Sequence, residues 1–224
     1  MTLVEAIILG SIQGITEFLP ISSSGHLVIA QSLLGLELPG NIIEVVTHLG
    51  TLLSVIIIFR KDIMKFLYDF NNPSTKKYIL FLLIGTIPAL IIGLSAKSII
   101  LLFFESVKMV SLSLIITGLI LFLSKKRSKK KSVINYKNSF MIGISQALAI
   151  MPGISRSGIT ISTGILLGMD AKEAARFSFL LAIPVIAGAT LITAIDMVGH
   201  PLLISYKIMF SALASSFVVG YLSL

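Results

Sequence analysis

The chain has 224 residues, of which 55% are hydrophobic and 12% charged, and its mean hydropathy is +1.01. A soluble domain usually carries about twice that proportion of charged residues. The apolar stretches are long enough to cross a hydrocarbon layer about 30 Å thick several times. Composition therefore predicts an all-α integral membrane protein, and the lack of cysteine excludes disulfides and thiolate chemistry.

Residues 3–36 are apolar but are interrupted by proline, glycine and a run of serines. This pattern predicts a re-entrant element, in which two short helices meet at a loop buried inside the protein, because broken backbone at membrane depth needs protein or water around it. Residues 138–168 have the same pattern. Five other segments are predicted to be full helical spans: about 42–59, 79–97, 107–124, 176–198 and 205–224.

The basic residues predict the orientation of these elements. Lys125–Lys131 carries six positive charges directly after an expected span, so a cytoplasmic loop is favoured over a nucleic-acid site. The basic 60–77 loop is expected on the same side, and the 98–106 loop outside. Region 3–36 then enters from the outer face and region 138–168 from the inner face, which describes an inverted repeat.

Residue matches at an offset of 133 support the repeat. They pair Gln13 with Gln146, Ser22 with Ser155, Ser24 with Ser157 and Gly25 with Gly158. We expect a single membrane domain over residues 1–224, with repeat 1 at about 3–97 and repeat 2 at about 107–224.

The first re-entrant element holds a carboxylate and an amide. Gln13 and Glu17 lie four residues apart, so a helix places them on one face. An ionisable group at membrane depth is costly and points to a functional site. The alternative is a polar pair that closes a contact between helices by hydrogen bonding.

The serine run that follows supplies both hydroxyls and a helix start. Ser22, Ser23 and Ser24 precede a predicted helix whose free N–H groups and dipole favour an anion. Either Ser22 or Ser23 can cap that helix while a neighbour faces substrate. His26 follows within the first turn and can act as base, acid or nucleophile at neutral pH.

The second re-entrant element places Arg156 at the start of a helix, between Ser155 and Ser157 and shortly before Thr160. A guanidinium there needs an anionic partner, and its fork fits phosphate oxygens. Because Arg156 has no acidic residue in its own element and Glu17 no basic one, we expect the two to meet in a composite site. A purely structural ion pair is the alternative.

A second polar pair occupies the expected span 42–59. Glu44 and His48 lie one helical turn apart near its outer end. They are candidates for supporting the main site or for contacting a metal.

Two motifs resemble signatures of the undecaprenyl-diphosphate phosphatase family, also called bacitracin-resistance proteins. The first runs from Gln13 and Glu17 through Phe18–His26, and the second spans Pro152–Thr160. The resemblance covers residues 3 to about 215 and implies an inverted-repeat enzyme that removes one phosphate from undecaprenyl diphosphate for cell-wall synthesis. It implies a site on the outer side of the plasma membrane.

The resemblance assigns roles to nine residues of this sequence. The implied catalytic residues are Glu17, Ser23, His26 and Arg156, and the implied supporting, substrate-binding residues are Gln13, Ser22, Ser155, Ser157 and Thr160. Ser24, in the same serine run, is a further substrate-binding candidate. The family accepts Glu or Gln at position 13, and His48 stands where Gln is expected.

The chemistry of these residues leaves the nucleophile open among Ser23, His26 and water. The preferred assignment makes Arg156 a phosphate clamp, Ser23 and His26 the nucleophile and base, and Glu17 a base or metal ligand. A divalent cation, Mg or Ca, is the expected cofactor, with no organic cofactor. Expected partners are the polyprenyl diphosphate, membrane lipids and a second copy in a homodimer, with no nucleic acid. A polyprenyl-phosphate flippase is the rival function.

Overall fold

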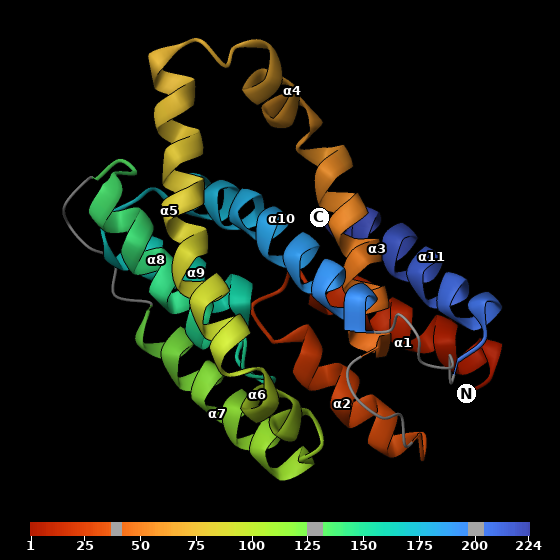
Figure 1. The fold of residues 1–224 in the computed structure, drawn as a ribbon. Helices are drawn as coiled ribbons and strands as arrows, with labels where there is room; N and C mark the ends of the chain where they lie inside the picture. The colour runs from red at the N-terminus through yellow and green to blue at the C-terminus, as the bar shows by residue number, and fades with distance from the viewer. Residues whose placement is uncertain (37–41, 125–131, 197–203) are drawn as a thin grey trace.

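The computed structural model describes residues 1–36, 42–124, 132–196 and 204–224. Across these ranges the chain is helical and has no strand, in agreement with the all-α prediction. The helices are α1 (Leu3–Thr16), α2 (Ser23–Leu33), α3 (Ile42–Ile58), α4 (Arg60–Tyr68), α5 (Pro73–Ser95), α6 (Lys97–Phe104), α7 (Val107–Leu123), α8 (Tyr136–Leu148), α9 (Arg156–Leu166), α10 (Ala171–Asp196) and α11 (Tyr206–Ser223) (Figure 1).

The helices α3, α5, α7, α10 and α11 overlap the five segments where spans are expected, although α5 and α10 begin five to six residues earlier than expected. Among the described residues, Pro73–Ser95 and Ala171–Ile195 are each long and apolar enough to cross a membrane. The number rises to as many as four if two bent helix pairs each count as one span: α3 with α4, bent by 67°, and α6 with α7, bent by 97°. The count of about five therefore stays a prediction.

Two connections expected as loops are helical. The 60–77 segment contains α4, and the 98–106 segment is largely α6. Neither helix contains a proline or glycine, so nothing in its sequence interrupts helical hydrogen bonding. The chain changes direction at the bends between helices instead, and an ion pair joins Asp62 of α4 to Arg176 of α10. The basic segment Lys125–Lys131 lies outside the described residues.

Two hydrophobic cores lie on either side of a central contact between α3 and α10. The first core joins α1, α2, α3 and α11 around Leu9, Leu27 and Ile43. The second joins α5, α8 and α10 around Phe81, Ile142 and Phe177. In both cores, the first helix of a broken element packs along a longer helix: α1 packs along α11, and α8 packs along α5.

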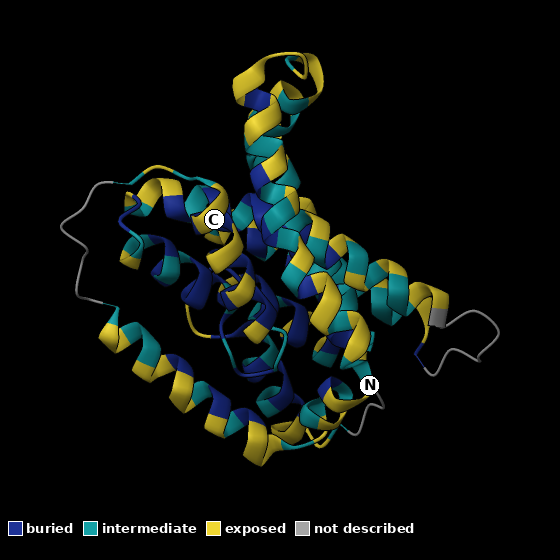
Figure 2. Cartoon of the chain, turned by 60° about the vertical axis from the view of Figure 1, so that its left-hand side comes forward, coloured by how far each residue is buried: buried dark blue, intermediate teal, exposed yellow. Residues whose placement is uncertain are grey.

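Glycines allow the closest of these contacts. A Cβ at Gly10 would lie 2.4 Å from the Ala212 carbonyl oxygen, and one at Gly143 would lie 2.5 Å from the Gly85 carbonyl oxygen. Lipid tails are as apolar as leucine, so helices in a membrane associate through such close packing rather than through the hydrophobic effect. Figure 2 shows the buried residues concentrated in the body of the molecule, while α4 and the start of α5 protrude with mostly exposed and intermediate residues.

Candidate active site

The loop between α1 and α2 carries the first group of polar side chains. Helix α1 ends at Thr16, with Glu17 as its C-cap, three residues before Pro20. Ser22 caps α2 by accepting a hydrogen bond from the Gly25 N–H at 3.3 Å. Its φ of 66° makes it the one non-glycine residue with positive φ in the described part of the chain. Such strained backbone is found preferentially at functional sites.

The loop between α8 and α9 is built in the same way. Ser155 caps α9 by accepting from the Gly158 N–H at 3.1 Å, and its hydroxyl lies 3.4 Å from that of Ser157. Ser157 does not cap the helix; its hydroxyl donates to the Leu19 carbonyl at 3.1 Å and so joins the two loops. The backbone around the polar groups is therefore fixed from both elements.

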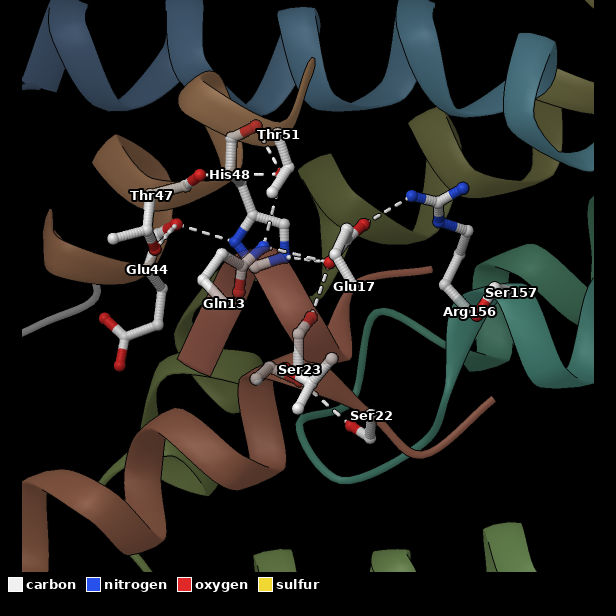
Figure 3. A network of polar contacts seen from close by, with 12 residues as sticks. Gln13, Glu17, Ser22, Ser23, Glu44, Thr47, His48, Thr51, Arg156 and Ser157 are labelled. Atoms are coloured by element: carbon white, nitrogen blue, oxygen red, sulfur yellow. Dashed lines mark hydrogen bonds and ion pairs between the residues drawn. The ribbon is translucent and has the colours of Figure 1, made fainter. Parts of the chain in front are cut away.

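Glu17 is the centre of the polar cluster (Figure 3). One carboxylate oxygen, Oε1, accepts from Arg156 Nη2 at 2.5 Å. The other, Oε2, accepts from the Ser23 hydroxyl at 2.5 Å and from Gln13 Nε2 at 2.9 Å. The expectations that Gln13 and Glu17 share a helix face and that Glu17 meets Arg156 are both confirmed.

A histidine also lies beside Glu17, and it is His48 rather than His26. The Nε2 atom of His48 is 3.3 Å from Glu17 Oε2, and its Nδ1 atom is 2.6 Å from the Glu44 carbonyl oxygen. Since a carbonyl only accepts, Nδ1 carries the hydrogen in that contact. The spacing of Glu44 and His48 marks a polar turn of α3, but nothing in the sequence shows that this turn faces Glu17.

His26 occupies a different position from the one expected. Its Nδ1 atom lies 2.8 Å from the Ser22 carbonyl oxygen, one turn back along the chain. The expected placement of His26 in the same cavity as Glu17 and Arg156 is wrong, because the side chain is not among those that line it. Hydrogen bonding to the Ser22 carbonyl instead holds the strained cap of α2.

The cavity beside the cluster has a volume of about 200 Å³, far more than the roughly 15 Å³ that one water needs. Of the ten residues singled out from the sequence, seven line it: Glu17, Ser22, Ser23, Ser24, Ser155, Arg156 and Ser157. Gln13, His26 and Thr160 do not. Thr160 instead makes a 2.6 Å hydroxyl contact with Ser178 on α10.

Glu44, His48 and Gln146 line the cavity but are not among those ten residues, although the sequence marks Glu44 and His48 as candidates for supporting the site. Glu44 and His48 come from α3, and Gln146 from α8. In the sequence, Gln146 stands out only because it matches Gln13 in the repeat, and this match is the one sequence feature that could have identified it. Thr51, whose hydroxyl lies 3.3 Å from Gln13 Nε2, was not signalled by any motif.

The burial of Glu17 explains why it has several partners. The residue is 7% exposed, and an isolated carboxylate so far from water would be very costly. The Arg156 side chain next to it is 16% exposed and opens onto the cavity. Losing one member of such a pair leaves an uncompensated buried charge.

The same contacts limit how a metal can bind. Within the described ranges, no group of three or more His, Cys, Asp or Glu side chains is placed to hold an ion. Both oxygens of Glu17 already accept hydrogen bonds, and Glu44 Oε1 accepts from Gln31 Nε2 at 2.6 Å. Within the described part of the chain, these side chains therefore form no complete set of metal ligands.

The fold and the cluster define a helical membrane protein with a polar cavity between two broken helical elements, where a serine lies next to a carboxylate and an arginine. The family model for the bacitracin resistance protein BacA matches residues 6–224. The chain therefore belongs to the BacA family.

Named relatives match over nearly the whole chain. An undecaprenyl-diphosphatase of Desulfosudis oleivorans is 41% identical, over 97% of this chain and 86% of that protein. One of Christiangramia forsetii is 42% identical, over 100% of this chain and 86% of its own. Undecaprenyl-diphosphatase 1 of Bacillus cereus is 41% identical, over 97% and 85%.

Proposed function

We propose that this chain hydrolyses undecaprenyl diphosphate to undecaprenyl phosphate and inorganic phosphate. Membership of the BacA family and the name undecaprenyl-diphosphatase shared by its relatives support the reaction. One observation carries the proposal in the structure: Ser23 and Arg156 both contact Glu17 at the wall of one cavity. The product would return the lipid carrier to cell-wall synthesis, the role that fits the family's link to bacitracin resistance.

Arg156 is the phosphate clamp in this proposal. Its guanidinium faces the cavity and offers donors in a fixed fork, which suits the oxygens of a terminal phosphate. The starts of α2 and α9 also face this space and add N–H donors and favourable helix dipoles. Phosphoryl transfer depends mostly on such positioning and charge stabilisation.

Ser23 is the proposed nucleophile and Glu17 its base, because the Ser23 hydroxyl donates directly to Glu17 Oε2. The Ser23 oxygen attacks the terminal phosphorus while its proton passes to Glu17. The bond from this phosphorus to the bridging oxygen breaks, and lipid phosphate leaves with that proton. A water then gives a proton to Glu17 and attacks the phosphoserine, and Ser23 leaves with the proton as inorganic phosphate is released.

The two histidines position other groups in this scheme. Gln13 donates to Glu17 Oε2 and holds the carboxylate toward Ser23. His48 lies 3.3 Å from the same oxygen through Nε2, which carries a hydrogen in addition to Nδ1 only in the imidazolium form. His26, first assigned as the base of Ser23, fixes the strained backbone at Ser22 through its Nδ1 contact. His26 therefore helps to position Ser23 by fixing the backbone of Ser22, the residue before it.

A divalent cation fits the site as a companion of the substrate. Mg²⁺ commonly binds through one or two carboxylates together with substrate phosphates and water. Because the described residues offer no complete ligand set, we propose that Mg or Ca arrives on the diphosphate, with Glu17 the nearest carboxylate. When bound, such an ion neutralises phosphate charge.

The repeat and its orientation also remain proposals. Matching serine caps at Ser22 and Ser155, 133 residues apart, support an inverted repeat that builds a single membrane domain. We propose that the cavity opens to the outer side of the plasma membrane, on the charge pattern of the sequence. We further propose that two copies of the chain associate as a homodimer.

A flippase would hold the same phosphates but needs no nucleophile, and the short contact of Ser23 with a carboxylate favours hydrolysis. The test is release of inorganic phosphate from undecaprenyl diphosphate by the purified protein in detergent. The parent should release phosphate and Ser23→Ala should not. Transport of the lipid without phosphate release would favour the flippase over the hydrolase.

A further inference from the structure

Gln146 in α8 has an unexplained side chain at the cavity. It is 1% exposed and lines the cavity, yet neither its Nε2 nor its Oε1 atom has a hydrogen-bond partner among the described residues. The assignment of oxygen and nitrogen does not affect this, because both atoms lack a partner. A buried polar group left without a hydrogen-bond partner is destabilising. A ligand held in the cavity within reach of this side chain would supply the missing partner.

Its repeat partner behaves differently. Gln13 Nε2 donates to Glu17 at 2.9 Å and lies 3.3 Å from the Thr51 hydroxyl. One atom of Gln13, Oε1, is also unpaired, but Gln13 does not line the cavity. The same residue type thus supports the carboxylate in one element and faces the ligand space in the other.

The surroundings of Gln146 indicate which part of the substrate it meets. Ala149 and Ile150 follow it by three and four residues and line the same cavity. Ile100 and Phe104 of α6 extend this apolar lining. The amide is therefore a polar group beside an apolar surface, which suits the end of an isoprenoid chain, whereas Glu17, Ser23 and Arg156 form the reacting cluster.

We propose that Gln146 binds the phosphate that is esterified to the lipid, by donating from Nε2 to one of its non-bridging oxygens. This inference rests on the proposed function and divides the diphosphate between two groups: Arg156 holds the terminal phosphate, and Gln146 holds the one that stays on the lipid. An uncharged donor binds phosphate less strongly than a guanidinium. It can therefore orient the substrate without retaining the lipid phosphate product.

The test compares ligands that do and do not contain the lipid-linked phosphate. For the full chain in detergent, Gln146→Leu should raise the KM for undecaprenyl diphosphate about tenfold, as loss of roughly 1.4 kcal/mol requires. Inhibition by a polyprenyl monophosphate should weaken by a similar factor. Inhibition by inorganic phosphate, which binds at Arg156, should be unchanged.

A second variant guards against a folding defect. Gln146→Asn keeps an amide but shortens its reach, so it should weaken inhibition by the monophosphate in the same way. Neither variant should unfold at a lower temperature than the parent, because neither removes a hydrogen bond of the ligand-free protein. The assignment would be overturned if inhibition by the monophosphate were unchanged. It would also be overturned if inhibition by the monophosphate and inhibition by inorganic phosphate weakened equally. If the parent releases no phosphate at all, the proposed reaction fails. Direct binding of the monophosphate to parent and variants then still decides the role of Gln146.

Discussion

Glu17 Oε1 and Arg156 Nη2 lie 2.5 Å apart although 139 residues separate them in the chain. Glu17 ends α1 and Arg156 begins α9, so each of the two broken helical elements supplies one charge. Neither element contains a partner for its own charge. The site therefore exists only when both elements pack together.

The guanidinium of Arg156 should be required for its shape as well as its charge. Arg156→Lys keeps a cation but loses the fork that contacts two phosphate oxygens, so we expect a loss of one to two orders of magnitude in kcat/KM. This corresponds to about 1.4–2.8 kcal/mol of transition-state stabilisation. Phosphate release measures the loss, and thermal unfolding in detergent serves as the control. A lysine variant with parental activity would favour a structural Glu17–Arg156 pair.

Two serines of the cluster should respond differently to removal of the hydroxyl. Ser23→Ala removes the proposed nucleophile and should abolish phosphate release while the protein stays folded. Ser157→Ala removes the bond to the Leu19 carbonyl and should lower stability by about 1 kcal/mol, with a smaller effect on turnover. Phosphate release and unfolding temperature, measured for both variants, separate these effects. Substantial turnover by Ser23→Ala would make water the nucleophile.

Close packing between α5 and α8 gives a prediction on stability. In Gly143→Ala the new methyl group would lie 2.5 Å from the Gly85 carbonyl oxygen, so the helices must separate. Overpacking of this kind costs about 1–3 kcal/mol. Gly118→Ala in α7 is the matched control, because nothing lies within 4 Å of its Cβ. Unfolding temperatures in detergent compare the two, and equal values would refute the close contact.

The proposed orientation can be tested with single cysteines, since the parent chain has none. Glu105→Cys and Ser128→Cys lie beyond opposite ends of α7. An impermeant thiol reagent should label the first in intact cells and the second only after permeabilisation, because Lys125–Lys131 is expected in the cytoplasm. Labelling of Ser128→Cys in intact cells would reverse the topology.

Divalent cations should act through the substrate. Because the described residues hold no group of three metal ligands, Mg or Ca should not change the unfolding temperature of the ligand-free protein. Chelation should nevertheless reduce phosphate release if the ion accompanies the diphosphate. A clear rise in unfolding temperature with Mg or Ca alone would instead require a metal site within the protein.

The sequence by itself determined the features that depend on neighbouring residues. Composition and helical periodicity located the apolar helices, and the serine run predicted a helix cap at Ser22 or Ser23, which the structure places at Ser22. The four-residue spacing of Gln13 and Glu17 placed them on one face. These properties follow from local backbone geometry, so they can be recognised without knowledge of the rest of the chain.

The tertiary structure decided which side chains share the cavity. It placed His48 rather than His26 beside Glu17, and it turned Gln146 toward the cavity while its repeat partner Gln13 bonds to Glu17. These outcomes depend on how α3 and α8 pack against their neighbours, with glycines such as Gly143 setting how near the helices approach. No motif encodes that rotation and depth, because they result from contacts between residues far apart in the chain.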